Sequence, residues 1–412
     1  MPERAIRLIK KIIPAKIFKF FQPFYHWALA WCAAFVYFFP ARKLKVIGVT
    51  GTNGKSTVVH LISEILEEAG EKVASVSSLR FRLNKSEKKN TLKMTMPGRF
   101  RLQKFLRSAV RAGCKYAVVE VTSEGIKQYR HIGINFYMAV LTNVTPEHIE
   151  SHGSFEAYRA AKAELFRKAP IHILNGEDPS IEYFLKIFGR EKVVYTKKDL
   201  PAEISLKLIG DFNRENAVAA YHVAKFLGVE SEIIKNVLER IKEVPGRLEF
   251  IQREPFAVVV DYAHTPDALR KVYEPLRLSL PTLGVGRKLI CVLGAAGGGR
   301  DKWKRPEFGK IAAEFCDEII LTNEDPYDED PVKILEGVKR GFLRDLNHKP
   351  PTTNYKLILD RREAIREALK SAHQDDVVII TGKGAEPWIM GPDGTKTPWD
   401  DRVVVREELA KL

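Results

Sequence analysis

The sequence predicts an α/β protein with two domains of alternating strands and helices, and two observations support this prediction. An apolar strand at residues 46–50 runs into a glycine-rich turn and then into a helix at 56–69. Further short apolar segments alternate with amphipathic helical segments along the 412 residues, as in parallel sheets covered by helices. Because this length exceeds one hydrophobic core, we expect a central domain at 44–244 and a C-terminal domain at 245–412, preceded by a short segment at 1–43.

The segment at 1–43 is basic at its ends and apolar in its middle. Residues 1–45 carry nine Lys and Arg against a single Glu, so this stretch holds more than half of the net charge of +15. Residues 23–39 form a run of seventeen without a formally charged side chain, and aromatic residues crowd both of its ends. Three interpretations stay open: an interfacial or re-entrant membrane helix, a helix packed on the protein's own surface or on a partner, and a transmembrane span. The basic flanks favour contact with anionic lipid.

The turn after the first strand has the residues of a phosphate-binding loop. It belongs to the run V-I-G-V-T-G-T-N-G-K-S-T at 46–57. Gly51 and Gly54 leave backbone N–H groups accessible to an anion. Lys55 adds a cation, and Ser56 adds a hydroxyl that can hold Mg²⁺ at the start of the helix. The strict pattern G-x-x-x-x-G-K-[ST] has glycine where this chain has Val49, so this is a shortened variant, and we expect it to bind the phosphates of a nucleoside triphosphate.

The alternation of strand and helix continues through the rest of the central domain. Arg99 opens a basic amphipathic helix that Gly113 ends, and Ser154 is expected to cap a later helix. The turn Val244-Pro245-Gly246 is the expected hinge to the next domain. The predicted strands lie at 115–121 and 136–142, and the predicted helices lie at 99–112, after Ser154, at 213–227 and at 231–241.

A second α/β unit of Rossmann-like character follows the hinge. Its predicted strands lie at 257–261, 288–294, 318–322 and 377–381, and its predicted helices begin at Pro266, Pro306 and Pro331. In open α/β sheets the chemistry collects at the carboxyl ends of the strands. The residues at or just past such ends are Glu120, Asn143, Asp261, Gly294, Asn323 and Gly382. We therefore expect the two domains to face each other across a cleft.

The four cysteines, at positions 32, 114, 291 and 316, lie far apart and form no C-x-x-C pair. This spacing argues against a disulfide framework and against a zinc ribbon, and it fits a reducing cytoplasm. We expect a cytoplasmic protein, with peripheral contact of residues 1–43 at the inner face of the membrane as a further hypothesis. The basic charge alone is weak support for nucleic-acid binding, and no nucleic-acid partner is expected.

Several sequence blocks, in a fixed order from Val46 to the C-terminus, resemble the Mur ligases, and most closely the MurE type. The blocks are G-T-N-G-K-S-T (51–57), E-V-T-S-E-G-I-K-Q-Y-R (120–130), T-N-V-T-P-E-H-I-E-S-H-G (142–153) with Y-R-A-A-K (158–162), G-D-F-N-R-E-N-A-V-A-A (210–220), P-G-R-L-E (245–249), D-Y-A-H-T-P-D-A-L (261–269) and G-K-G-A-E (382–386). The resemblance implies a central P-loop ATPase domain with a parallel sheet and a Rossmann-like C-terminal domain. It also implies an ATP-dependent ligase that adds an amino acid, a diamino acid in this interpretation, to a muramoyl-peptide in peptidoglycan synthesis through an acyl phosphate.

The same resemblance implies roles for particular residues in binding ATP and two Mg²⁺ ions. The residues expected to contact ATP are Gly51, Thr52, Asn53, Gly54, Lys55, Ser56, Thr57, Asn213, Asn216, Arg247 and Asp261. Those expected at the metal ions are Ser56, Glu120, His148 and Lys162, with Lys162 carbamylated, and Lys55, His148 and Lys162 are the expected catalytic residues. Structural alternatives stay open: a solvated helix lysine for Lys162, a loop histidine for His148, and a helix N-cap for Asn213. Asp261 has the alternative of merely ending a strand.

The resemblance also implies residues that contact the two substrates. The resemblance places Thr95, Ser123 and Arg130 at the muramoyl-peptide, with Arg130 suited to a carboxylate or phosphate. It places Asp325, Tyr327 and Glu386 at the incoming amino acid.

Three departures from the MurE pattern put the acceptor and the amino acid in question. Too few residues precede the P-loop for a UDP-binding domain, so we expect the acceptor to be recognised without a dedicated UDP pocket, at a membrane or on a lipid carrier. The D-N-P-R motif reads E-D-P-Y at 324–327, so Tyr327 replaces the arginine that would clamp a distal carboxylate. Lysine and ornithine are therefore alternatives to diaminopimelate, unless Arg300, Lys302 or Arg305 takes over. Glu124 replaces a histidine, and the loop at 294–302 is one residue longer than usual.

Other functions are weighed beside this one. One alternative is an enzyme of the folylpolyglutamate-synthetase or cyanophycin type, which shares the P-loop and fold. Such an enzyme, or another amino-acid ligase, would act on a different acceptor, and a lipid-linked acceptor is among the options. The Mur-like half of a glutamine-dependent amidotransferase is disfavoured, because a metal-binding cysteine cluster is missing from the sequence. A membrane-recruited ATP-binding adaptor without turnover predicts degraded catalytic positions, whereas Lys55, Glu120 and Lys162 are in place.

Overall fold

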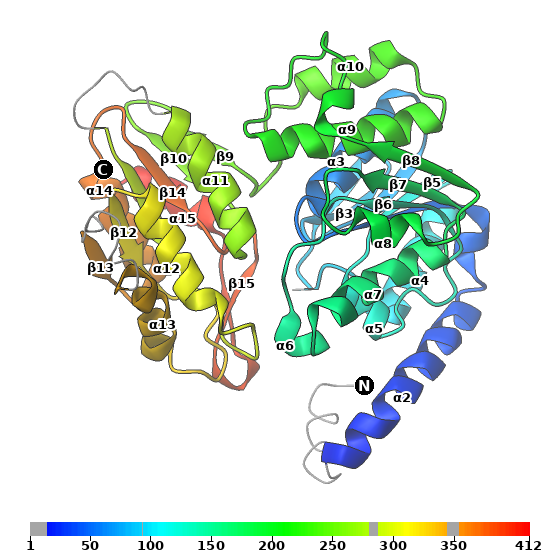
Figure 1. Ribbon diagram of the computed structural model, residues 1–412, viewed down its shortest axis with the longest axis horizontal. Coiled ribbons are helices and arrows are strands. Elements are labelled where there is room, and N and C mark those ends of the chain that lie inside the picture. The colour runs from blue at the N-terminus through cyan, green and yellow to red at the C-terminus, as the bar shows by residue number, and fades with distance from the viewer. Residues whose placement is uncertain (1–14, 93, 280–286, 344–353) are drawn as a thin grey trace.

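The computed structural model describes residues 15–92, 94–279, 287–343 and 354–412. Its strands form two large sheets, which lie in the two halves of Figure 1 and are connected through the turn at 244–246. The helix α2 (Ala15–Val36) and the short 3-10 helix η1 (Pro40–Lys43) precede the first sheet. The predicted fold class, two α/β units behind a short helical segment, is confirmed.

The first sheet has eight strands in the order β4-β3-β2-β5-β1-β6-β7-β8. The strands are β1 (Lys45–Thr50), β2 (Val73–Val76), β3 (Arg80–Leu83), β4 (Ser86–Lys89), β5 (Tyr116–Glu120), β6 (Phe136–Leu141), β7 (Ile171–Asn175) and β8 (Glu191–Tyr195). The predicted strands β1, β5 and β6 lie together in the parallel centre, where both faces are covered. The parallel part of the sheet continues at one edge into an antiparallel hairpin of β3 and β4, which turns around Asn84, whose φ is 51°. That hairpin is polar, so it lacks the apolar run that identifies the central strands.

Helices cover both faces of this sheet and form two hydrophobic cores. One core lies under α3 (Lys55–Glu68), α9 (Asp211–Phe226) and α10 (Ser231–Arg240), and the other under α4 (Arg99–Arg111), α7 (Phe155–Arg167) and α8 (Ile181–Leu185). The predicted cap of α7 is confirmed, since Ser154 Oγ accepts a hydrogen bond of 3.1 Å from the backbone N–H of Ala157. Two short helices, α5 (Ser123–Lys127) and α6 (Ile149–His152), and the 3-10 helix η2 (Lys197–Asp199) lie in the connections.

The second sheet has six strands in the order β13-β12-β11-β14-β10-β9, and β9 alone of these runs antiparallel to its neighbour. The strands are β9 (Glu249–Gln252), β10 (Ala257–Val260), β11 (Leu289–Leu293), β12 (Glu318–Leu321), β13 (Tyr355–Leu357) and β14 (Val377–Ile380). One face packs on α11 (Pro266–Ser279), α12 (Lys304–Phe315) and α13 (Pro331–Leu343), and the other on α14 (Arg361–Ser371) and α15 (Asp401–Leu409). A hairpin of β15 (Trp388–Met390) and β16 (Lys396–Pro398) with the 3-10 helix η3 (Pro392–Gly394) completes this half. The four strands predicted here are confirmed, and α12 begins two residues before Pro306, where the first helical N–H groups have no intrahelical partner in any case.

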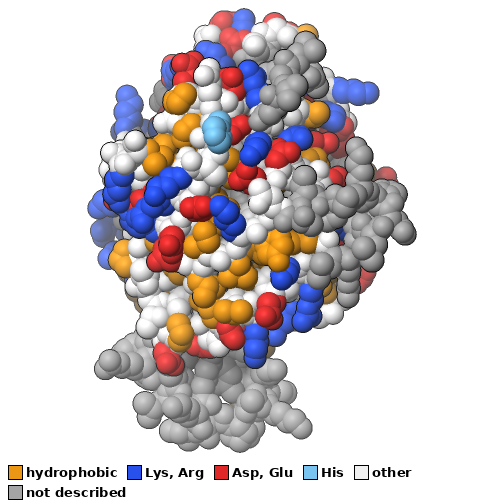
Figure 2. Space-filling model, turned by 90° about the vertical axis from the view of Figure 1, so that its left-hand side faces the viewer, with side chains coloured by type: hydrophobic (Ala, Val, Ile, Leu, Met, Phe, Trp, Pro, Cys, Tyr) orange, Lys and Arg blue, Asp and Glu red, His pale blue; other side chains and the backbone are white. Residues whose placement is uncertain are grey.

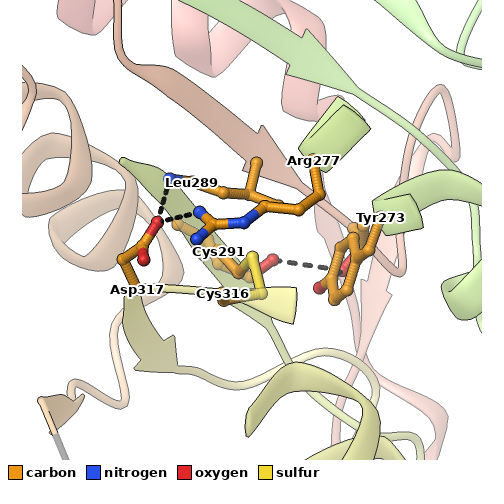
Figure 3. The surroundings of a disulfide bond; sticks show 8 residues. Tyr273, Arg277, Leu289, Cys291, Cys316 and Asp317 are labelled. Atoms are coloured by element: carbon orange, nitrogen blue, oxygen red, sulfur yellow. Dashed lines mark hydrogen bonds and ion pairs between the residues drawn. A yellow bond between two sulfur atoms is a disulfide. The ribbon is translucent and has the colours of Figure 1, made fainter. Parts of the chain in front are cut away.

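A disulfide bond joins Cys291, inside β11, to Cys316, which follows α12 (Figure 3). The expectation that the cysteines form no disulfide is therefore wrong. Their separation of 25 residues hides the contact, because the crossover from β11 through α12 to β12 brings the end of the helix back over the strand. Beside the disulfide, the carboxylate of Asp317 accepts hydrogen bonds from Arg277 and from the backbone N–H of Leu289, so the same corner is also closed by polar contacts.

The helix α2 lies against α4 on the outside of the first half (Figure 1). Its residues Ala30, Ala33 and Ala34 are buried. Within the described part of the chain, α2 included, the helices lack the combined length and apolar character needed to cross a bilayer. Of the three interpretations of this segment, packing on the protein's own surface is confirmed for one face of the helix.

Candidate active site

Three adjoining cavities lie where the two halves of the molecule face each other. The largest, of about 150 Å³, surrounds the P-loop and is lined by Lys55, Glu120, His148 and Lys162 among others. A second, of about 60 Å³, extends toward α9, and a third, of about 30 Å³, extends into the C-terminal half. Tyr262 and His264 line all three cavities, so the loop after β10 forms a wall common to all of them.

The two glycines of the P-loop are required by the close approach of neighbouring residues. Gly54 caps α3 with a φ of +83°, and a Cβ there would lie 2.2 Å from Asn216 Oδ1. A Cβ on Gly51 would lie 1.8 Å from Thr142 Oγ1. Any side chain would therefore displace the loop from the strand β6 and the helix α9 that hold it. Asn53 is fixed in turn by Asn143, whose Oδ1 accepts its N–H at 2.9 Å.

A hydroxyl and a carboxylate meet at the start of α3, as the Mg²⁺ hypothesis requires. Ser56 Oγ donates a hydrogen bond of 2.8 Å to Glu120 Oε2 at the end of β5. The same carboxylate oxygen accepts the backbone N–H of Ser78 at 2.9 Å, and the hydroxyls of Ser56 and Ser78 are 2.7 Å apart. Ser78 is thus a site residue that the sequence analysis missed, since nothing in its local pattern connects it to the P-loop.

Two lysines converge on one carbonyl oxygen. Lys55 Nζ donates to the carbonyl oxygens of Gly51 at 3.0 Å and Thr52 at 2.7 Å, and Lys162 Nζ donates to that of Gly51 at 2.6 Å. Burial lowers the pKa of both amines, most strongly that of Lys162, and the charge of Lys55 lowers the pKa of Lys162 further. The interpretation of Lys162 as a solvated helix lysine is wrong, because this side chain is 2% exposed and lies in the site.

His148 lies next to Glu147 at the entrance to α6. Its Nε2 is 3.7 Å from Glu147 Oε1, and burial lowers its pKa to about 2, so the ring is neutral near pH 7. The second carboxylate oxygen, Glu147 Oε2, is buried without a hydrogen-bond partner among the described residues. Glu147 is a further site residue that the sequence analysis missed, although it lies inside the block at 142–153.

Of the two residues expected at the base of ATP, Asn216 lines the second cavity and Asn213 lies behind it. Asn216 Nδ2 donates to Asn213 Oδ1 at 3.3 Å. Asn213 itself lies inside α9, which Gly210 caps, so the N-cap alternative for Asn213 is wrong. Asp261 also lines this cavity, and its carboxylate accepts the backbone N–H groups of Ala263 and Leu248 at 2.6 and 2.7 Å.

Arg247 brings a cation from the C-terminal half to the P-loop. Its guanidinium lies 4.5 Å from the centre of the Tyr262 ring, and its Nη2 is 3.5 Å from Ser56 Oγ. Arg247 lines both the first and the second cavity. An anion at the P-loop would therefore be held from both halves of the molecule.

Two of the three residues expected at the acceptor line the first cavity, and the third, Arg130, does not. Thr95 and Ser123 line the first cavity, and Ser123 Oγ is 3.2 Å from His152 Nε2. Arg130 instead donates to the carbonyl of Met96 and, at 2.8 Å, to Gln128 Oε1, so it holds the turn that carries Thr95. Burial lowers the pKa of Arg130 to about 10.

Two of the three residues expected at the incoming amino acid, Asp325 and Glu386, bind Lys383, which sequence reasoning did not single out. Lys383 Nζ donates to Asp325 Oδ1 at 2.9 Å and to Glu386 Oε2 at 2.6 Å, and it is fully buried. Glu386 and Asp325 line the third cavity, whereas the backbone N–H of Tyr327 donates to the carbonyl of Met390 at 3.1 Å. Tyr327 has a φ of 51°, and its ring packs on Gly298, where a Cβ would lie 2.5 Å away.

The loop at 294–302 clamps the two halves together beside the site. Asp301 accepts the backbone N–H groups of Ile149 and Glu150 at 3.2 and 2.9 Å, so it caps α6 from the opposite half. Lys304 Nζ donates to Glu147 Oε1 at 2.5 Å, and both side chains are buried. On the other side of the cleft, Asn53 Nδ2 donates to Asp267 Oδ2 at 2.9 Å.

The donors present fit Mg²⁺ bound together with a nucleotide. Within the described residues there is no cluster of three or more His, Cys, Asp and Glu side chains placed to hold a metal ion. Mg²⁺ in phosphoryl-transfer sites is held instead by one or two carboxylates, substrate phosphates and water. The pair Ser56 and Glu120 beside the phosphate loop supplies that donor set.

These features define a class of protein: a two-domain P-loop enzyme whose nucleotide site is completed by residues of a Rossmann-like domain. Comparisons with known proteins agree. The model of the Mur ligase middle domain matches residues 49–199, and that of the Mur ligase glutamate ligase domain matches residues 246–384.

Two relatives and one solved structure carry the same name. The UDP-N-acetylmuramoyl-L-alanyl-D-glutamate--2,6-diaminopimelate ligase of Aquifex aeolicus (strain VF5) is 37% identical over 396 residues, which cover 90% of this chain and 78% of that protein. The ligase of the same name from Gloeobacter violaceus is 37% identical over 409 residues, which cover 92% of this chain and 80% of that protein. A solved structure of that name aligns with a TM-score of 0.57 and 28% identity over 89% of this chain and 78% of that one. The chain therefore belongs to the Mur ligase family.

It is accordingly an ATP-dependent ligase that joins an amino acid to a muramoyl-peptide in peptidoglycan synthesis, and its family uses ATP and Mg²⁺. A Mycobacterium tuberculosis folylpolyglutamate synthase complexed with ADP aligns with a TM-score of 0.67 but 17% identity, over 86% of this chain and 91% of that one. That likeness is one of fold, so the folylpolyglutamate alternative is the less supported one.

Proposed function

We propose that the enzyme adds a diamino acid, with 2,6-diaminopimelate the first candidate, to the D-glutamate of a muramoyl-dipeptide. The mixed charge of the third cavity is the observation that supports this. It is lined by the cationic side chains of Arg300, Lys304 and Arg305 and by the carboxyl groups of Asp301, Glu324, Asp325 and Glu386. An amino acid whose distal end carries an ammonium group, a carboxylate or both needs charges of both signs around it. The names of the similar proteins support the same amino acid.

Arg300 is the best placed of the three residues that could replace the missing arginine of the E-D-P-Y motif. It lines both the first and the third cavity, between the reacting centre and the distal pocket. Arg305 is engaged with Glu329, to which its Nη2 donates at 2.9 Å, and Lys302 is 64% exposed. We assign Arg300 to a carboxylate of the incoming amino acid and Glu386 to its distal ammonium group.

The reaction follows from the arrangement around the P-loop. The acceptor carboxylate attacks the γ-phosphorus of ATP and forms an acyl phosphate while ADP leaves, and the amine then attacks the carbonyl carbon and releases phosphate. Lys55 and Arg247 offset the repulsion between the carboxylate and the triphosphate. Bound Mg²⁺ would neutralise phosphate charge further, with Ser56 and Glu120 as its protein ligands.

We further propose that Lys162 is carbamylated and that two Mg²⁺ ions bind, the second near His148. The depressed pKa of Lys162 supports this, because the neutral amine is the form that captures CO₂. Carbamylation would turn the buried neutral amine beside Lys55 into an anion that can face metal. The domain limits 1–43, 44–244 and 245–412 and a cytoplasmic site of action belong to the same proposal.

The test is phosphate release from ATP and Mg²⁺ with UDP-muramoyl-L-Ala-D-Glu as acceptor, scanned over diaminopimelate, lysine, ornithine and the other amino acids. We expect release that depends on both partners and is greatest with one diamino acid, with Lys55→Ala inactive. Arg300→Ala should raise KM for that amino acid about tenfold or more and leave KM for ATP nearly unchanged. Release with a monoamino acid alone would contradict the assignment. If the UDP-linked acceptor gives no release, the same scan with a lipid-linked muramoyl-dipeptide separates a wrong carrier from a wrong reaction.

A further inference from the structure

The face of α2 that points away from the protein consists of large apolar side chains. Phe24, Trp27, Trp31 and Phe35 follow one another at intervals of three or four residues, which places them on one side of the helix. The exposed members of this face are Phe21, Phe24, Tyr25, Trp27, Trp31, Phe35 and Val36, with Phe38 just beyond the helix, and their exposure ranges from 43% to 75%. We call this set the aromatic face. An exposed apolar surface of this extent marks an interaction site on a folded protein.

The opposite face of α2 is firmly packed, so the aromatic face belongs to a fixed helix. Ala30, Ala33 and Ala34 are buried against the body of the protein, where α4 is the main neighbour. Ala34 approaches Gly133 so closely that a Cβ on the glycine would lie 2.4 Å from the Cβ of Ala34. The small residues let the helix lie close to the protein, and the large ones point outward.

The surface beside the aromatic face is basic. The helix α4 carries five basic residues and no acidic one: Arg99, Arg101, Lys104, Arg107 and Arg111. Arg42 and Lys43 are exposed just after α2, and the Arg107 guanidinium lies 6.0 Å from the ring of Phe38. Burial lowers the pKa of His26 on α2 to about 4, and the positive charges of Arg99 and Arg130 contribute to this lowering. By contrast, Lys, Arg, Asp and Glu are interspersed on the face of the C-terminal half seen in Figure 2.

The aromatic face begins at the acceptor side of the active site. Phe21, Pro23, Phe24 and Trp27 form an open groove of about 540 Å³ together with Tyr129. Tyr129 has a φ of 57° and precedes Arg130, which holds the turn of Thr95. A surface bound to α2 would therefore lie beside the residues expected to face the muramoyl-peptide.

We propose that α2 docks this protein on an anionic lipid bilayer, with the aromatic face in the interfacial layer and the basic side chains of α4 at the headgroups. Tryptophan and phenylalanine with flanking Lys and Arg match the chemistry of that interface. A second copy of this chain fits less well, since a two-fold contact through α2 would bring the basic α4 helices toward each other. The proposal does not depend on which amino acid the enzyme adds.

The test is flotation of the full-length protein with vesicles of phosphatidylglycerol and phosphatidylcholine, compared with vesicles of phosphatidylcholine alone. We expect binding to the anionic vesicles only, weakened by salt. Phe24→Ser combined with Trp31→Ser should lower the partition coefficient about tenfold or more. The matched control is Phe188→Ser, which alters a side chain that is 89% exposed at a distance from α2 and should bind as the wild type does.

A second pair of variants tests the basic surface. Arg101→Gln with Lys104→Gln should weaken binding to anionic vesicles, whereas Lys333→Gln with Lys370→Gln, which removes two exposed charges from the C-terminal half, should not. Unchanged phosphate release with a water-soluble acceptor shows that each variant is folded. The proposal is overturned if the wild type does not bind anionic vesicles, if it binds neutral ones equally, or if the aromatic variant binds as well as the wild type. A concentration-dependent dimer that the aromatic variant abolishes, without lipid binding, would assign the face to a second copy.

Discussion

Lys55 and Lys162 donate to the same carbonyl oxygen, that of Gly51. Two ammonium groups this close repel each other, and burial penalises both charges. Each effect favours the neutral amine of Lys162, as its lowered pKa indicates. The environment that makes this lysine unfavourable as a cation thus makes it suitable for conversion to a carbamate.

We expect Lys162→Met to lower the rate of phosphate release at least about a hundredfold while the fold is retained, because the buried anion would be lost. In ¹³C-bicarbonate the wild type should show a carbamate carbon signal by NMR that Lys162→Met lacks. Lys168→Met changes an exposed lysine just past the same helix and should keep both the signal and the activity. A wild type without the signal, or an active Lys162→Met variant, would contradict the carbamate.

The buried side chain of Glu324, in the C-terminal half of the site, gives a pH-dependent test. Burial and the neighbouring charge of Asp325 together raise its pKa to about 7, against the opposing charge of Lys383. A carboxyl with a raised folded-state pKa destabilises the fold as pH rises from its unfolded value toward 7, since the unfolded chain ionises first. We expect the free energy of unfolding to fall by about 3 kcal/mol over that window, and Glu324→Gln to remove this fall. Denaturant titrations at pH 5 and pH 8 measure it, and equal pH slopes for both proteins would disprove the assignment.

At the scale of elements, the crossover from β11 through α12 to β12 shows how a common supersecondary unit creates a contact that spacing does not reveal. Cys291 lies in β11 and Cys316 directly follows α12. Both side chains belong to the hydrophobic core between this helix and the sheet. The disulfide closes a loop with a sequence separation of 25 residues. The motif E-D-P-Y follows β12, the next strand along the chain.

Cys291→Ser with Cys316→Ser should lower the free energy of unfolding by about 3 kcal/mol, because the open loop gains conformational freedom in the unfolded chain. Thermal unfolding with and without a reductant measures this: the wild type should shift on reduction and the double variant should not. Cys32→Ser, which removes an exposed free thiol, is the control and should match the wild type. A wild type insensitive to reductant under unfolding conditions would show that the bond does not form.

At the scale of the whole molecule, the two halves make a single site only because loops from the C-terminal half reach the P-loop side. Asp301 caps α6, Lys304 pairs with Glu147, and Asp267 binds Asn53. These contacts position Arg247, Tyr262 and His264 at the P-loop cavity. These polar contacts hold the closed arrangement together with Phe212 of α9, which packs against the hydrophobic core of the C-terminal half.

We expect Asp301→Ala to lower kcat/KM for ATP about tenfold or more, because the capping contacts at α6 are lost, with little change in thermal stability. Small-angle scattering should show a larger radius of gyration for this variant in the presence of nucleotide. Lys302→Ala is the control, since its backbone N–H rather than its side chain donates to Glu150. An unchanged kcat/KM would show that this clamp does not govern closure.

The sequence by itself determined the local units. The strand, turn and helix of the P-loop, the parallel strands β5, β6, β10, β11, β12 and β14, and the cap at Ser154 all follow from backbone requirements, burial periodicity and capping within a few residues. The blocks that resemble the family also identified residues that line one cavity, among them Lys55, Glu120 and Lys162. The strands β2 and β7 are as buried as the central strands and nevertheless escaped prediction. The polar hairpin β3–β4 and the edge strands β8, β9 and β13, whose burial pattern carries less information, escaped prediction as well.

The tertiary structure alone decided which distant residues meet. Ser78 joins Glu120, Asp301 caps α6, Cys291 bonds Cys316, and Tyr262 and His264 become the wall of all three cavities. It also decided that Arg130 supports a turn and that the outer face of α2 stays uncovered. Such contacts depend on how helices and sheets pack across long sequence separations, which local periodicity and residue chemistry do not encode.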